Sequence, residues 1–234
     1  VRLLLVAGGG GGGGSAWAGG GGAGGVVIAN SYTVIPGTRY NLIVGQGGAG
    51  GANIKCGDGS NGSDSWFSNS SFAAKGGGGG GGYGWPDTSG TCGQGMSGGS
   101  SGGTAETQME VNSPAITQNT PSGATTSYGN IGGRLSKSNG SQAGTGGGGA
   151  GGVGESVSEF RVPGNGGIGI QSDITGENKY TSNCINCSNE KIRERLKNDM
   201  EFKITNNLRN RVYQALKGLT KSENTKKLLG CSIE

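Results

Sequence analysis

Cysteine pairs come closest, in residue type and spacing, to a chemical site in this chain. Cys184 and Cys187 are separated by two residues, the spacing at which a Cys pair supplies two ligands to zinc. A structural zinc site needs four ligands, and the sequence contains no His to complete the set. We therefore predict at most a half-site here, and no cofactor. Cys56 and Cys92 could pair in an oxidising environment, although two free thiols are the more common state.

The absence of His removes much enzymatic chemistry, although hydrolysis by a carboxylate pair stays open. Ser–His and Cys–His pairs and imidazole general bases are all impossible without it. The 15 Asp and Glu residues are scattered, and no pair stands out as the two carboxylates of a hydrolase. No Gly run continues into the Gly-Lys-Ser/Thr that a phosphate-binding loop requires. We expect that the chain is not an enzyme.

Aromatic side chains are the best candidates for a binding surface. On rigid loops they give a large contact area at low entropic cost, and they stack on sugar rings or apolar receptor patches. The alternative is that they form the domain's own core. The candidates are Trp17, Trp66, Phe67, Phe72, Tyr83, Trp85 and Tyr128. We favour the core for Trp66, Phe67 and Phe72, and exposure for Trp17 and Trp85.

Glycine must supply the framework that positions these residues. The chain has 234 residues, of which 57 are Gly and 30% are hydrophobic, whereas an average protein has about 7% Gly. Gly loses about 0.5–1 kcal/mol more backbone entropy than Ala on folding, and an ordinary core of this size could not offset that loss. The Gly runs are therefore either flexible linkers or a structure that only Gly can form.

Packed polyglycine-II helices are the ordered alternative. This helix has three residues per turn, and its N–H and C=O groups point outward to neighbouring helices. The long runs that begin at Gly8, Gly76 and Gly146 form a loose repeat. The apolar segments between Gly runs favour order. We predict a mainly β and irregular fold over 1–182, with a short β-sheet base and packed polyglycine-II helices.

One β-hairpin is expected in that base. The runs 26–35 and 40–44 alternate apolar and polar residues, and Pro36-Gly37 between them has the composition of a tight turn. We predict that the two runs pair with each other and are half-buried.

The ordered succession of four motifs in residues 1–182 resembles the glycine-rich domain of phage tail-fibre and related virion proteins. The motifs are "LLLVAGGGGGGG", "VIPGTRYNLIVGQGGAGG", "AAKGGGGGGG" and "GNGGIGIQSDITGENKYTS". The resemblance implies packed polyglycine-II helices that present variable loops to a host-surface glycan or protein. It also implies a virion or extracellular location and a fibre partner or self-association. The chain departs from the pattern after Tyr180, where such domains continue into another Gly run.

The last segment, 183–234, has a different composition. Lys, Arg and helix formers replace Gly, and apolar residues follow helical spacing at Ile204, Leu208, Val212 and Leu216. We expect a small α-helical segment here. "NLRNRVYQALKG" followed by "LLGCSIE" is similar to the region upstream of the catalytic motif in phage-type HNH homing endonucleases, and no catalytic motif follows it.

This tail is the source of the net positive charge. Residues 1–180 hold 8 basic and 9 acidic residues, and residues 181–234 hold 11 basic and 6 acidic residues. The tail could bind nucleic acid weakly and without sequence specificity, or it could be the solvated face of a helical hairpin. The alternative function is thus a remnant of an HNH-type nuclease or a DNA-binding protein with a Gly-rich extension. No apolar run reaches the length of a membrane span, so we expect none.

Overall fold

The computed structural model describes residues 1–84, 92–106, 112, 114–135, 142–174, 176 and 178–181. All of them belong to the first of two units into which the chain divides, Val1–Cys187. The described residues contain eight short strands and no helix, which confirms a mainly β and irregular fold. The predicted helical tail lies outside the described residues, as do Trp85, Cys184 and Cys187.

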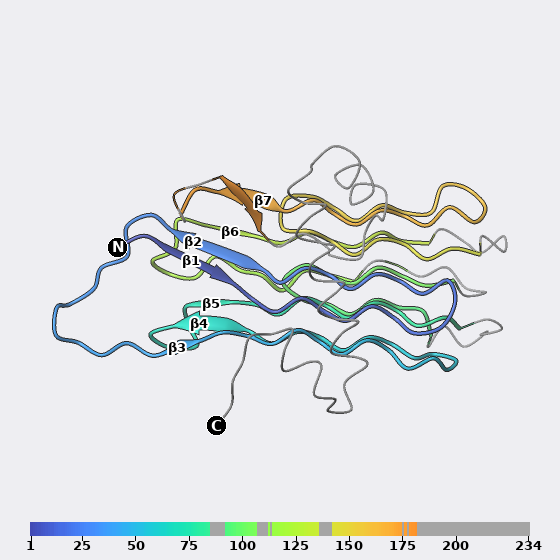
Figure 1. The fold of residues 1–234 in the computed structure, drawn as a ribbon, viewed down its shortest axis with the longest axis horizontal. Coiled ribbons are helices and arrows are strands. Elements are labelled where there is room, and N and C mark those ends of the chain that lie inside the picture. The colour runs from blue at the N-terminus through green and yellow to red at the C-terminus, as the bar shows by residue number, and fades with distance from the viewer. Residues whose placement is uncertain are drawn as a thin grey trace, which may run out of the picture. The chain divides into compact units, whose positions relative to one another are not determined.

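The strands form three small antiparallel sheets, and β1 to β6 gather at one end of this unit (Figure 1). The first sheet has the order β1-β2-β6: Leu3–Val6, Val26–Ala29 and Thr126–Tyr128. The second has the order β3-β4-β5: Leu42–Ile43, Ser65–Phe67 and Ala73–Ala74. The third pairs β7 with β8: Ile170–Ser172 and Lys179–Thr181.

The predicted hairpin between 26–35 and 40–44 is wrong. Val26 in β2 pairs with Val6 in β1, whereas Leu42 in β3 pairs with Phe67 in β4, so the two runs belong to different sheets. Leu42 is also 58% exposed rather than half-buried. The alternation of apolar and polar residues within a run does not show which strand pairs with it. In the structure β2 pairs with β1, and β3 pairs with β4.

The turn between these runs has the expected geometry. The N–H of Thr38 donates to the carbonyl oxygen of Ile35 (3.1 Å), and Gly37 has a φ of +80°. Pro at the second position and a positive φ at the third are the features of a type II turn.

A small apolar core lies at the strand end. Leu5 and Val27 from the first sheet are buried with Phe72, and Tyr32 and Phe67 pack against them. The Tyr32 ring lies 4.9 Å from Phe72 and 5.4 Å from Phe67, edge-on to both. Burying such aromatic rings contributes much of the apolar stabilisation available to a domain with so few large side chains.

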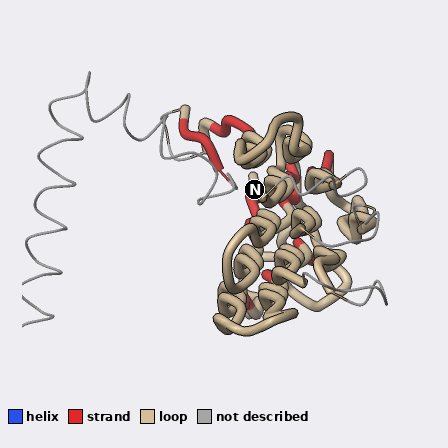
Figure 2. Tube along the Cα trace, turned by 90° about the vertical axis from the view of Figure 1, so that its right-hand side faces the viewer, coloured by secondary structure: helices blue, strands red, loops and turns tan. Residues whose placement is uncertain are grey.

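Beyond the strands the chain continues as an array of Gly-rich segments that run side by side (Figure 1). Figure 2 is turned by 90° from Figure 1, and in this view the segments appear as adjacent coils. We call this the glycine array; its segments are 8–14, 19–25, 46–52, 57–64, 76–84, 93–105, 129–134, 143–155 and 163–169.

Hydrogen bonds in the glycine array recur every third residue. Gly8, Gly11 and Gly14 donate to the carbonyls of Ser63, Ser60 and Gly57, and the carbonyls of the same three glycines accept from Gly77, Gly80 and Tyr83. Gly10 and Gly13 instead donate to Gly22 and Gly19, and the carbonyls of Gly9 and Gly12 accept from Gly48 and Gly51. Segment 8–14 therefore bonds four neighbouring segments, each from a different side.

Segment 57–64 of the glycine array bonds segment 76–84 through side chains as well as through its backbone. Asp58, Asn61 and Asp64 are spaced three apart, and one carboxylate or amide oxygen of each accepts a backbone N–H, from Gly82 (2.7 Å), Gly79 (2.9 Å) and Gly76 (2.8 Å). We call these three residues the capping ladder. They supply the acceptors for these three N–H groups, so buried N–H groups remain satisfied.

Candidate binding surface at the loop end

The turns opposite the strands hold the best candidate site. The turns 15–18, 53–56 and 156–162 connect segments of the glycine array at its far end (Figure 1); we call this the loop end. Backbone hydrogen bonds to several neighbours fix the segments that carry these turns, so the turns extend from a rigid base.

Left-handed backbone conformations are concentrated at this end. Six non-Gly residues in the described part of the chain have positive φ. Ser68 lies in the β4–β5 turn, and the other five are at the loop end: Ser15 (71°), Trp17 (55°), Cys56 (59°), Gln142 (49°) and Arg161 (61°). Such conformations cost about 1–3 kcal/mol each and tend to occur at functional sites.

Trp17 and Tyr83 meet at the loop end. Their rings pack edge to face with centroids 5.0 Å apart, and the Trp17 side chain remains 36% exposed. Burial, and to a lesser extent the carboxylate of Glu106, raise the pKa of Tyr83. Glu106 is itself buried, and its backbone N–H donates to the carbonyl oxygen of Trp17 (3.2 Å). The pair is thus held by both backbone and ring contacts.

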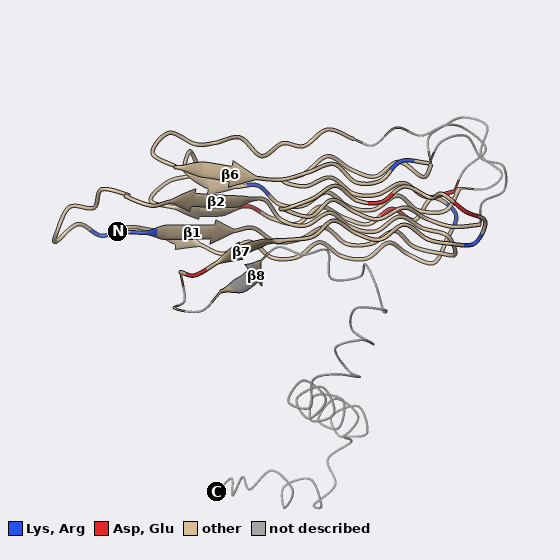
Figure 3. Ribbon diagram, turned by 90° about the horizontal axis from the view of Figure 1, so that it is seen from above, with Lys and Arg blue, Asp and Glu red and all other residues tan. Residues whose placement is uncertain are grey.

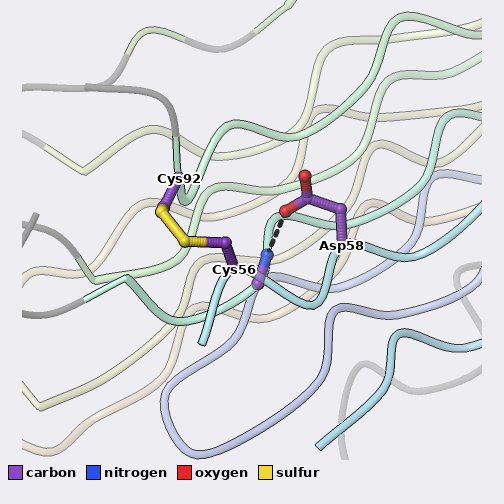
Figure 4. Close-up of a disulfide and its surroundings, with 4 residues drawn as sticks. Cys56, Asp58 and Cys92 are labelled. Carbon is purple, nitrogen blue, oxygen red and sulfur yellow. Dashed lines mark hydrogen bonds between the residues drawn. A yellow bond between two sulfur atoms is a disulfide. The ribbon is translucent and has the colours of Figure 1, made fainter. Parts of the chain in front are cut away.

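A disulfide joins Cys56 to Cys92, with Cα atoms 4.9 Å apart (Figure 4). Of the two alternatives that the sequence left open, the structure shows the pairing and not two free thiols, because the glycine array brings residues 36 apart in the sequence into contact. The backbone N–H of Cys56 donates to the carbonyl oxygen of Tyr83 (2.9 Å). The crosslink therefore fixes the turn next to the aromatic pair.

An open groove of about 540 Å³ lies beside Trp17. Its lining includes Ser15, Trp17, Gln142, Arg161 and Pro163, which come from three separate parts of the chain. We call it the Trp17 groove.

Arg161 supplies the groove's positive charge. Its Nε donates to Oε1 of Gln142 (2.7 Å), and its guanidinium carbon lies 4.9 Å from the centre of the Phe160 ring. The ribbon positions of Lys, Arg, Asp and Glu lie toward the ends of the segments, and few fall in the central stretch of the glycine array (Figure 3). Within the described residues, no group of three Cys, Asp or Glu side chains is arranged to hold a metal ion.

The predicted binding residues do not form one cluster. Trp17 and Tyr83 lie together at the loop end, whereas Trp66 and Phe67 lie in β4 and Tyr128 in β6, at the strand end. Phe67 packs against the core and Phe72 is part of it, as favoured from the sequence. Trp66 and Tyr128 are half-buried.

Sequence reasoning missed Arg161 and Gln142 as site residues. Arg161 is flanked by Phe160 and by a Val-Pro-Gly turn, which marks an exposed turn in a Gly-rich region. Nothing in the sequence indicates that this turn lies near Trp17, because the two residues are far apart in the chain and are brought together by the packing of the glycine array.

A family model described as a glycine-rich domain matches residues 1–183. No curated protein and no solved structure matches the chain. Where the structure describes the chain, no helix is long and apolar enough to cross a membrane.

Proposed function

The chain belongs to the glycine-rich domain family through residues 1–183, and from this premise we propose that it is the structural and adhesin module of a phage-like viral fibre. In this proposal the Gly runs are polyglycine-II helices and form the framework of the module. The loop end binds a glycan or protein on the host surface.

Hydrogen bonding at every third residue supports polyglycine II. A helix of three residues per turn directs successive N–H groups to three sides, and segment 8–14 bonds different neighbours in that rotation. Gly is required because the segments approach closely. A Cβ on Gly8, Gly11 or Gly14 would overlap the carbonyl oxygen of Gln46, Ala49 or Ala52.

The observation that carries the adhesin proposal is the loop end itself. An exposed Trp, an open groove and five left-handed non-Gly residues coincide at one end of a rigid array. Left-handed conformations of non-Gly residues cost free energy and tend to cluster at ligand-binding sites, which supports a binding role for this end.

Surface binding by matched Trp variants tests the proposal. The full chain is labelled and applied to a panel of microbial cells and to a printed glycan array. We expect Trp17→Ala to weaken binding about tenfold or more, because it removes the exposed anchor of the groove. Trp66→Ala, at the strand end, should leave binding unchanged if it folds normally. Equal losses in both variants, or no binding by the unaltered chain, would overturn the proposal.

A further inference from the structure

We propose that the Trp17 groove binds a sugar bearing a carboxylate, such as a uronic or sialic acid unit of a surface polysaccharide. This inference rests on the proposed adhesin function and names the ligand class of the same surface. It follows from the charge, the hydrogen-bonding capacity and the aromatic surface that the groove brings together.

The charge of Arg161 has no acidic partner in the described part of the chain. The ion pairs there are Arg2 with Asp173 and Lys75 with Asp64. Arg161 is instead held by the neutral amide of Gln142. A guanidinium positioned by a neutral acceptor keeps its full positive charge for an incoming anion.

Among the described residues, the outer edge of the Arg161 guanidinium has no hydrogen-bond partner. Nε donates to Gln142, and the guanidinium carbon lies over the Phe160 ring. No described residue accepts a hydrogen bond from the two terminal nitrogens. Two parallel N–H groups on a planar fork match the two oxygens of a carboxylate.

In this proposal, Trp17 supplies the apolar surface on which the pyranose ring of the acidic sugar packs. Its indole is fixed edge to face against Tyr83 yet 36% exposed, and it lines the same groove as Arg161. Sugar rings present apolar C–H faces that pack on exposed indoles. A carboxylate on Arg161 and a pyranose ring beside Trp17 would use both features at once, whereas an inorganic anion would use only the first.

The backbone conformation of the groove favours pre-organised binding. Ser15, Trp17, Gln142 and Arg161 all line the groove, and all four have positive φ. Conformations of this kind fix side-chain direction in advance, which lowers the entropy lost on binding. The arrangement fits a small rigid ligand better than a flexible peptide.

Matched sugars and matched Arg variants test the inference. Galacturonate, glucuronate and N-acetylneuraminate are titrated against the isotope-labelled full chain by NMR, with galactose and glucose as neutral partners. The readouts are the indole Nε1–H of Trp17 and the Nε–H of Arg161. We expect at least one acidic sugar to shift both signals saturably, with affinity about tenfold or more above that of its neutral partner.

The variants separate the guanidinium fork from simple charge. Arg161→Gln should lose the preference for the acidic sugar, and Arg161→Lys should retain only part of it, because Lys keeps the charge without the fork. Arg39→Gln removes the same charge at the strand-end turn and should change nothing. Equal losses for Arg39 and Arg161 variants, binding of neutral sugars alone, or shifts with none of the three acids would overturn the inference.

Failure of the inference is distinguishable from failure of the proposed function. If cell or glycan binding depends on Trp17 but not on Arg161, the adhesin proposal stands and the acidic-sugar inference falls. If neither variant affects surface binding, the adhesin proposal itself fails.

Discussion

At the residue scale, the glycine array makes opposite demands on adjacent glycines. A Cβ on Gly11 would overlap the backbone carbonyl of Ala49, whereas a Cβ on Gly12 has the Gly19 oxygen, at 3.8 Å, as its nearest neighbour. Both residues lie in the same run and neither has a positive φ. Sequence gives no way to tell them apart, because every residue of 8–14 is Gly.

Alanine substitutions at these two positions test the close packing. Gly11→Ala should lower the free energy of unfolding by about 1–3 kcal/mol or more, because backbone must move to admit the methyl group. Gly12→Ala should be neutral or stabilising by roughly 0.4–1 kcal/mol, because it reduces the freedom of the unfolded chain. Thermal unfolding compares the two. Equal effects would contradict the packing.

The pKa of Tyr83 provides a second residue-scale test. Burial first and Glu106 second raise it above the ordinary value of 10.0. Because the folded chain then holds this proton more tightly than the unfolded chain, the contribution to stability is present below about pH 10 and is lost as pH rises through the folded pKa. NMR titration of labelled Tyr should show a high midpoint that falls in Glu106→Gln. Tyr83→Phe assigns the signal, and an unchanged midpoint in Glu106→Gln would remove the carboxylate as a cause.

At the element scale, the capping ladder shows how side chains of one segment bond the backbone of another. Asn61 accepts from the N–H of Gly79, and its own amide donates to the carbonyl of Ser97 (3.1 Å). Gly79 is buried, so loss of the acceptor leaves its N–H unsatisfied.

We expect Asn61→Ala to lower the free energy of unfolding by about 1–3 kcal/mol and the Tm by several degrees. Asn61→Asp keeps an acceptor oxygen and should lose less. Asn53→Ala is the matched control, because Asn53 is exposed on the 53–56 turn and its side chain bonds no described residue. If Asn61→Ala unfolds at the same temperature as Asn53→Ala, water replaces the ladder as the acceptor for this N–H group.

Some elements were predictable from the sequence and others were not. Local residue preferences predict the short apolar strands and the Pro36-Gly37 turn. They also predict the three-residue period of the Gly runs. They do not predict strand partners, because β2 and β3 follow each other in the chain, joined by residues 30–41, yet belong to different sheets. The Cys56–Cys92 pairing and the Trp17 groove depend on which segments lie side by side, and runs of identical glycines carry no information about register.

At the scale of the whole unit, backbone hydrogen bonds link the segments of the glycine array to one another. Segment 76–84 bonds to 8–14, 19–25, 57–64 and 93–105, and Gly76 to Gly82 are all buried. A flexible linker of the same composition would leave these amides in water. Amide hydrogen exchange distinguishes the two states directly, since protected amides exchange only when the structure opens.

We expect amides of 76–84 to exchange at least about a thousandfold more slowly than in an unstructured chain, as follows from a stability of about 5 kcal/mol or more. The exposed turn around Pro36 should exchange almost freely and is the internal reference. Gly11→Ala should accelerate exchange in 46–52 and 76–84 together, because segment 8–14 bonds both, whereas Gly12→Ala should not. Mass spectrometry of pepsin fragments resolves these regions. Rapid exchange throughout the Gly runs would contradict the lattice, and acceleration confined to 8–14 would show that the segments open independently, so that the loop end has no rigid support.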